Sequence, residues 1–330
     1  MLLAEKRLPC AEKAARGAFF FFDTKERWNF QVWYWYAIAA LLFWSGSDIF
    51  SKIGSRPDDR FSHWKMVMAV GLVMGLHAGY EIFFRKVPIS LDIIIAYLPA
   101  SLLYIVSMLL GYIALRYIEL SVSSPICNSS GAIAAIFCLL VLGQRMEGLQ
   151  MAAVAMVCVG VIALGIVEYR EDEEARLERQ KACNIKYAKS LVAILLPVLY
   201  CLIDAAGTVA DEILLDSLDE NSANVAYELT FLFMGVCAFI YTVIIKKDKI
   251  TIPREGPKLL GGLCETIGQF CYVHALASGQ ASMAAPVVAS YCVVSVLWGR
   301  IFLKEKLSWK HYAAILFTAA GIVILGVFDG

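Results

Sequence analysis

The stretch GYIALRYIELSVSSPICNSS, residues 111–130, aligns without a gap with YVHALASGQASMAAPVVASY, residues 272–291. Several of the matches involve Pro and Ser, which rarely coincide by chance in apolar sequence. The matching pairs are Ala114 and Ala275, Leu115 and Leu276, Ser121 and Ser282, Pro125 and Pro286, and Ser129 and Ser290. A shared register at a spacing of 161 residues indicates an internal duplication.

The duplication extends in both directions from this stretch. Toward the carboxyl terminus the same register pairs Leu142 with Leu303, Ala152 and Ala153 with Ala313 and Ala314, Gly160 with Gly321, and Gly165 with Gly326. Toward the amino terminus, a spacing of 156 residues places Trp44, Asp48 and Lys52 on Tyr200, Asp204 and Thr208. The chain therefore consists of two related halves.

Composition places both halves in a membrane. The 330 residues are 60% hydrophobic and 18% charged, with a mean hydropathy of +0.67. The apolar residues form runs of about twenty, long enough to cross ~30 Å of hydrocarbon at about 1.5 Å per helical residue. Soluble helices would carry a charge every turn or two. The formal net charge is zero, so nothing suggests a nucleic-acid partner.

The charge-poor runs predict an all-α integral membrane fold with ten transmembrane helices. The expected spans are residues 33–53, 64–84, 93–115, 120–143, 149–168, 188–210, 225–245, 257–277, 280–303 and 310–328. The expected segments are an amino-terminal leader (1–28), a first five-helix repeat (29–169), a charged linker (170–187) and a second five-helix repeat (188–330). Because five crossings are an odd number, the second repeat must enter from the opposite side, which makes this an inverted-topology repeat.

Each half ends in the same succession of segments. The first has ALRYIELSVSSP, LGQRMEG and VGVIALG, and the second has ALASGQASMAAP, LKEKLSW and AGIVILG. This pattern resembles the drug/metabolite transporter superfamily, and within it the ten-helix permeases with paired EamA domains, over about residues 33–328. The resemblance implies a transporter in which the third, fourth, eighth and ninth helices surround a central cavity. It does not identify a substrate.

Acidic residues inside the first and sixth spans are candidate site residues, because an ionisable side chain in the bilayer is costly unless it is paired or faces water. Asp48 shares a helical face with Trp44, and Asp204 shares one with Tyr200 and then Asp211. Two interpretations stay open. Either these groups bind substrate, or Asp48 pairs with Lys52 one turn away while Asp204 bonds to a neighbouring helix.

Two polar stripes are expected to face each other across the cavity that the resemblance implies. Glu265, Gln269 and Tyr272 share one helical face in the eighth span, and Tyr97, Ser101 and Tyr104 form the matching stripe in the third. We expect Glu265 to face this cavity, since a carboxylate facing lipid would be costly. Protonation of Glu265 is the candidate for coupling to a proton gradient.

Further candidates lie where proline loosens a helix. Asn128 and Ser129 follow Pro125, and Ser290 and Tyr291 follow Pro286, so they are read as either structural or substrate-binding hydrogen-bonding groups. Separately, three glycines at GxxxG spacing in the second span predict close helix packing, within the chain rather than across a dimer. These are Gly71, Gly75 and Gly79.

The sequence contains no HExxH, GxSxG, P-loop or GxGxxG motif, so we expect no enzyme, metal site or cofactor. The predicted function is a secondary active carrier in the cell membrane, monomeric or homodimeric. Its expected cargo is a small polar or amphipathic metabolite such as an amine, organic cation or amino acid. The alternatives are a nucleotide-sugar or phosphate-ester exchanger and, in another class, a non-transporting membrane sensor or scaffold.

Orientation stays open at this stage. Lys and Arg are more numerous on the side opposite the amino terminus. The positive-inside rule would therefore place both termini outside, whereas the resembled permeases keep them inside.

Overall fold

The computed structural model describes residues 24–55, 59–116, 120–143, 145–169, 191–278, 281–303 and 308–328, and their regular structure is helical. The helices are α2 (Thr24–Gly54), α3 (Ser62–Phe83), α4 (Leu91–Ala114), α5 (Leu120–Asn128), α6 (Ser130–Leu140), α7 (Gly148–Tyr169), α9 (Leu191–Leu215), α10 (Glu220–Phe239) with a π-helical end (Ile240–Ile245), α11 (Ile252–Ser278), α12 (Ala281–Ala289), α13 (Tyr291–Phe302) and α14 (Trp309–Phe328). The expected linker and most of the expected leader lie outside the described residues. Helix α2 begins at Thr24, so the last residues of the expected leader are helical.

Side-chain caps set the start of two helices. The Ser90 hydroxyl accepts a hydrogen bond from the Ile93 N–H at 3.3 Å before α4. The Asp219 carboxylate accepts one from the Ser222 N–H at 3.0 Å before α10. Each cap satisfies a backbone donor that the first helical turn leaves free.

Four helical stretches of the described chain are long and apolar enough to cross a membrane by composition alone. They are Ser62–Phe83, Leu91–Ala114, Glu220–Ile245 and Ala281–Phe302. Helices α2 and α11 carry Asp48, Lys52 and Glu265, which interrupt their apolar character. These charged residues face the interior, as described below.

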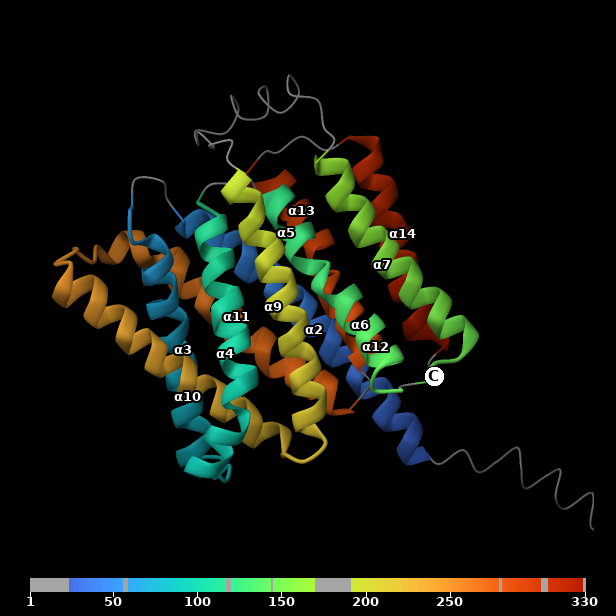
Figure 1. Cartoon of the computed structure of the whole chain (residues 1–330), viewed down its shortest axis with the longest axis horizontal. Coiled ribbons are helices and arrows are strands. Elements are labelled where there is room, and N and C mark those ends of the chain that lie inside the picture. The colour runs from blue at the N-terminus through green and yellow to red at the C-terminus, as the bar shows by residue number, and fades with distance from the viewer. Residues whose placement is uncertain are drawn as a thin grey trace, which may run out of the picture.

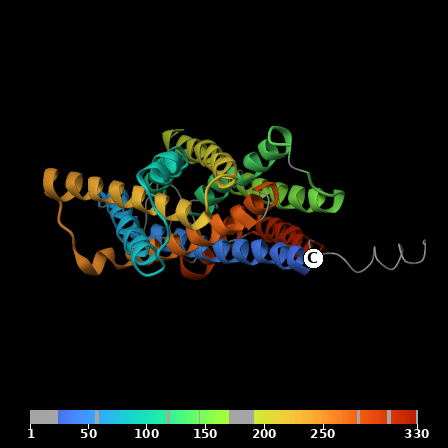
Figure 2. The ribbon, with the colours of Figure 1, turned by 90° about the horizontal axis from the view of Figure 1, so that it is seen from below.

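The helices pair side by side in a reciprocal pattern. Helix α2 runs along α11, α4 along α9, α3 along α10, and α7 along α14. Figure 1 shows the α3–α10 pair at one end of the bundle and the α7–α14 pair at the other. Figure 2, turned by 90°, agrees that α2 and α11 lie beside each other.

Two of the expected spans are broken helices that meet at the centre. Ser129 separates α5 from α6, and Ser290 separates α12 from α13. Pro125 lies in α5 and Pro286 in α12, each four residues before its break. Helix α6 packs on α12, where a Cβ built on Gly131 would lie only 2.4 Å from the Ala289 Cβ.

The GxxxG glycines of α3 differ in their surroundings. A Cβ on Gly71 would lie 2.7 Å from the Phe231 carbonyl oxygen and 3.0 Å from the Gly235 Cα, so α3 and α10 touch backbone to backbone. Gly75 of α3 lies against Leu232 of α10, whereas a Cβ on Gly79 would meet no atom within 4 Å. The close packing predicted for these glycines is thus seen at Gly71 and Gly75 but not at Gly79.

We expect Gly71→Ala to destabilise the protein and Gly79→Ala to leave it equally or slightly more stable. Forcing a methyl group against rigid backbone costs about 1–3 kcal/mol, whereas an open helical position favours Ala over Gly. Thermal unfolding of the purified protein in detergent would measure the difference. Equal midpoints for the two variants would contradict the close α3–α10 crossing.

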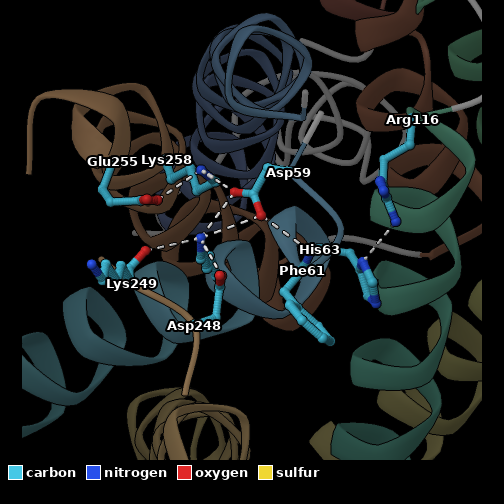
Figure 3. A network of polar contacts seen from close by, with 9 residues as sticks. Asp59, Phe61, His63, Arg116, Asp248, Lys249, Glu255 and Lys258 are labelled. Carbon is cyan, nitrogen blue, oxygen red and sulfur yellow. Dashed lines mark hydrogen bonds and ion pairs between the residues drawn. The ribbon is translucent and has the colours of Figure 1, made fainter. Parts of the chain in front are cut away.

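An ionic cluster ties together the connections at one end of the bundle (Figure 3). Lys65 Nζ lies 3.2 Å from Asp59 Oδ2 and 2.7 Å from Asp248 Oδ2. Lys258 Nζ lies 2.7 Å from Glu255 Oε2 and 3.7 Å from the same Asp59 oxygen. The cluster therefore links the α2–α3 connection and the start of α3 to the α10–α11 connection and the start of α11.

Candidate functional site

A central cavity is lined by residues of α2, α4, α5, α6, α9, α10, α11, α12 and α13. Its volume is about 80 Å³, counted as the space open to the centre of a water molecule. At about 10–15 Å³ per water, this is room for several waters. Ten of the predicted site residues line it: Trp44, Asp48, Tyr104, Asn128, Tyr200, Asp204, Glu265, Gln269, Tyr272 and Tyr291.

Two aspartates on the cavity wall are held by serine hydroxyls. Asp48 Oδ2 accepts hydrogen bonds from Ser124 at 2.6 Å and Ser295 at 2.7 Å. Asp204 accepts from Ser130 at 2.8 Å, and the Ser107 hydroxyl lies 3.4 Å from its other oxygen. In each half an aspartate of the first helix is therefore bonded to the broken helices at the centre.

The third carboxylate of the wall is Glu265 on α11. Its side chain is 8% exposed and lies beside Ser47 and the Trp44 indole. No ion pair joins Glu265, Asp48 or Asp204 to a Lys or Arg among the described residues, and none of the cavity-lining residues in that part of the chain is basic. The cavity is thus an acidic site without a protein counter-cation in the described structure.

A network of tyrosines joins the two polar stripes at one end of the cavity. Tyr104 donates to Asp211 at 2.8 Å, and Tyr97 donates to the other oxygen of the same carboxylate. The Tyr104 and Tyr272 hydroxyls lie 3.0 Å apart, and Tyr272 donates to Thr208 at 3.0 Å. This Tyr–Asp network, comprising these five residues, links α4, α9 and α11.

Aromatic rings form another part of the wall. The Trp44 ring lies 5.0 Å from the Tyr272 ring and 5.8 Å from the Tyr291 ring, measured between centroids. Gly268 permits this approach, because a Cβ there would lie 2.4 Å from the Trp44 ring. Aromatic faces of this kind attract organic cations and also pack against sugars.

Four hydrogen-bond donors of the wall are left unused. They are all buried and have no hydrogen-bond partner among the described residues: Trp44 Nε1, Ser51 Oγ, Tyr112 Oη and Gln269 Nε2. Buried donors in native proteins are nearly always satisfied, so such groups are suited to an acceptor on a bound molecule. The cavity therefore offers carboxylates for a positive group and donors for an acceptor group.

Four predicted residues do not line the cavity. Tyr97 is outside the cavity lining, and its hydroxyl donates a hydrogen bond to the Asp211 carboxylate. The buried Ser101 hydroxyl has no hydrogen-bond partner in the described structure. Ser129 lies at the break between α5 and α6. The Ser290 hydroxyl donates to the Val287 carbonyl oxygen at 2.5 Å, which satisfies a backbone acceptor near the break of α12 from α13.

The alternative pairing of Asp48 with Lys52 is wrong. Lys52 Nζ instead donates to the Leu115 carbonyl oxygen at 2.7 Å, where it satisfies the end of α4. The carboxylate of Asp48 is occupied by Ser124 and Ser295. The charge of Asp48 is therefore left for the cavity.

Several lining residues were not predicted as site residues. They are chiefly hydroxyl groups: Ser47, Ser51, Ser123, Ser124, Thr208 and Tyr227. A serine in an apolar run is a weak signal, because its hydroxyl can bond to its own helix backbone. Asp211 continues the stripe of Asp204 by two turns, and that spacing was the available signal for it.

A model of the EamA-like transporter family matches residues 31–166 and again residues 191–327. The chain belongs to the EamA-like transporter family. Together with the apolar helices, this makes it a multi-pass membrane protein. The resemblance inferred from the repeated segments is confirmed.

Curated relatives of this EamA-like transporter match it only in part. A putative sugar uptake protein of Lactobacillus johnsonii is 29% identical over 134 residues, which are 39% of this chain and 44% of the relative. An uncharacterized transporter in the cobO 3′ region of Sinorhizobium sp. is 35% identical over 69 residues, which are 21% of this chain and 49% of the relative. The matched segments span less than half of each relative.

Among the solved structures that match this chain, one crystal structure of a protein shares its fold. It aligns with a TM-score of 0.61 at 13% sequence identity, covering 88% of this chain and 95% of the other. At this identity the likeness concerns the fold alone.

Proposed function

We propose that this EamA-like transporter is a secondary carrier for a small organic cation or zwitterion, such as an amine or amino acid. The observation that carries the proposal is the central cavity, whose described wall holds three carboxylates, aromatic rings and four unused donors but no basic side chain. A positively charged nitrogen would be drawn to the carboxylates and the Trp44 ring. An acceptor on the same molecule would take the donors of Tyr112 and Gln269.

The architecture proposed for this carrier is ten transmembrane helices in two inverted repeats, residues 29–169 and 188–330. The reciprocal packing supports it. The sequence duplication relates α2 to α9 and α4 to α11, so the α2–α11 pair corresponds to the α9–α4 pair, and both are in contact. The two broken helices, which also correspond, meet at the centre. Such repeats are typical of carriers that expose a midplane site alternately to each side.

Two networks are suited to act as gates on opposite sides of the site. The cavity lining runs from Tyr104 to Leu115 at the end of α4 and Leu120 at the start of α5. The Tyr–Asp network lies at the Tyr104 end, and the ionic cluster of Figure 3 lies toward the opposite end of the bundle. The duplication pairs Tyr97 of the first with Lys258 of the second. Both networks are formed, and a cavity of about 80 Å³ fits an occluded state.

Glu265 is the proposed coupling residue. It is buried beside Trp44 without an ion-pair partner in the described chain. Its negative charge is therefore either offset by a cationic substrate or removed by a proton. Exchange of one for the other would couple substrate movement to a proton gradient.

A neutral sugar is the second candidate substrate. It is favoured by the relative named as a putative sugar uptake protein and by the hydroxyl-rich, aromatic wall. A nucleotide-sugar or phosphate ester fits less well, because phosphate recognition calls for Lys or Arg and the described wall has neither.

Counterflow in liposomes tests these candidates directly. Purified protein is loaded with an amine, an amino acid, a neutral sugar or a nucleotide-sugar, and exchange of the labelled compound is followed. We expect exchange of an amine or amino acid. Exchange of the sugar alone would select the second candidate, and exchange of the nucleotide-sugar alone would overturn both.

Glu265→Gln is expected to abolish amine uptake driven by a proton gradient and to flatten the pH dependence of counterflow. The amide neither takes up a proton nor carries charge at any working pH. Asp216→Asn, which removes an exposed carboxylate outside the cavity, is the matched control. Unchanged gradient-driven uptake and an unchanged pH profile in Glu265→Gln would refute the coupling role.

A further inference from the structure

A second polar group lies between α3 and α10, outside the central cavity, and its histidine side chain is 30% exposed whereas its other members are buried. It consists of His77 and Glu81 on α3 with Asn224 and Glu228 on α10, and none of the four lines the cavity. Glu228 and Glu81 are 0% and 2% exposed, which is costly in a membrane unless their charges are offset.

The histidine stands between the two carboxylates. His77 Nδ1 lies 2.8 Å and 3.0 Å from the two oxygens of Glu228, and Nε2 lies 3.6 Å from Glu81 Oε1. A neutral imidazole has one N–H and one bare lone pair, so it can satisfy only one of two facing acceptors. With both carboxylates ionised and the ring neutral, one ring nitrogen would direct its lone pair at an anionic oxygen. The arrangement therefore calls for one additional proton.

The charges around His77, Glu81 and Glu228 also indicate that the group needs one additional proton. Arg85 Nη1 lies 3.3 Å from Glu81 Oε1 and offsets that carboxylate, although the arginine is half exposed. Asn224 donates to Glu228 Oε1 at 3.0 Å but brings no charge. From α11, His77 meets the Phe270 ring at 5.6 Å, and Phe270 separates it from His274. Glu228 is thus neutralised only when a proton joins the group.

Two acceptors of the group remain unused. Glu81 Oε2 and Asn224 Oδ1 are buried and have no hydrogen-bond partner among the described residues. The group is therefore poor in donors as well as in positive charge, which independently indicates a positively charged ligand. The described residues hold no cluster of His, Cys, Asp and Glu suited to a metal ion. The positively charged ligand that fits this group is therefore a proton.

We propose that His77, Glu81 and Glu228 form a proton-binding site separate from the substrate cavity. The bound proton lets both ring nitrogens of His77 carry an N–H, with Nδ1 facing Glu228 across on α10 and Nε2 facing Glu81 of its own helix. Its loss leaves two buried carboxylates facing a neutral ring and weakens the contact between these helices. This goes beyond the proposed function, because the site is independent of what the cavity carries.

The test is the pH dependence of thermal stability in detergent, which needs no substrate. Since the folded site holds a proton, the wild-type unfolding midpoint is expected to fall by about 2–4 °C as the pH rises from about 6 to 9. His77→Gln and Glu228→Gln should each flatten this slope. His274→Gln is the matched control, because the His274 ring bonds to the Phe270 carbonyl oxygen of its own helix, and it should keep the wild-type slope.

A slope that is the same in wild type and His77→Gln would overturn the proposal. So would an increase in the midpoint with Na⁺ at constant pH and ionic strength that His77→Gln abolishes, since this would assign the site to a metal cation. If the His77 and Glu228 variants do not fold, a His63→Gln/His274→Gln/His311→Gln protein leaves His77 as the only histidine. Nitrogen NMR of its ring should then report a proton on the His77–Glu228 pair near neutral pH. A neutral ring titrating as in a free peptide would contradict the proposal.

Discussion

Asp48→Asn and Asp204→Asn should each lower amine transport by about 30-fold or more. Removing one member of a buried, hydrogen-bonded charge interaction costs about 2–5 kcal/mol, and about 1.4 kcal/mol corresponds to a factor of ten. The amide also presents a donor where Ser124 and Ser295, or Ser130, now donate to a carboxylate. Counterflow in liposomes at saturating and subsaturating amine separates the loss of binding from the loss of turnover.

The double variant sharpens this prediction. If one substrate contacts both carboxylates, the losses of the single variants will not add up in Asp48→Asn/Asp204→Asn. The exposed Asp216→Asn controls for a general effect of charge removal. Full amine transport by both single variants would show that these carboxylates bind no cation and would leave the neutral sugar as the better candidate.

Lys258→Met is expected to lower the free energy of unfolding by about 3 kcal/mol. Lys258 is 1% exposed, and its removal leaves Glu255 without its ion-pair partner and Asp59 with only Lys65. Leaving a buried charge unpaired costs about 3–5 kcal/mol, reduced here because both acids are partly exposed. Thermal unfolding in detergent measures the effect as a lower midpoint.

The chain offers two controls for the lysine variant. Lys249 is exposed and contributes only its backbone carbonyl oxygen to the cluster, so Lys249→Met should leave the midpoint unchanged. Lys258→Met/Glu255→Leu removes both charges and should recover part of the loss. A Lys258→Met protein as stable as Lys249→Met would mean that the ionic cluster does not hold these helices together.

Periodicity and duplication were enough to predict the central carboxylates. Asp48, Asp204 and Glu265 are rare charges in apolar runs, and the bilayer leaves such groups few places other than the interior. The facing stripes of α4 and α11 were predicted in the same way, and the Tyr104–Tyr272 contact brings them together. These predictions depend only on helical spacing and on the cost of burying charge.

The partners of those residues were beyond sequence reasoning. Lys52 follows Asp48 by one turn, yet its amine bonds to the Leu115 carbonyl oxygen of another helix. Likewise, Glu228 reaches His77 only through the packing of α3 on α10. Contacts between helices depend on rotation and crossing angle, which local sequence does not encode.

The glycine crossing of α3 and α10 has a mechanical consequence. Lys65 and His77 stand six residues before and after Gly71, so each lies about 9 Å from the contact along the helix axis. The backbones of α3 and α10 come closest at Gly71, so a rocking of α3 about this crossing would close contacts on one side of it and open them on the other. The Lys65–Asp248 contact, made to the connection after α10, and the His77–Glu228 contact lie on opposite sides of the crossing. Strengthening either contact should therefore strain the other.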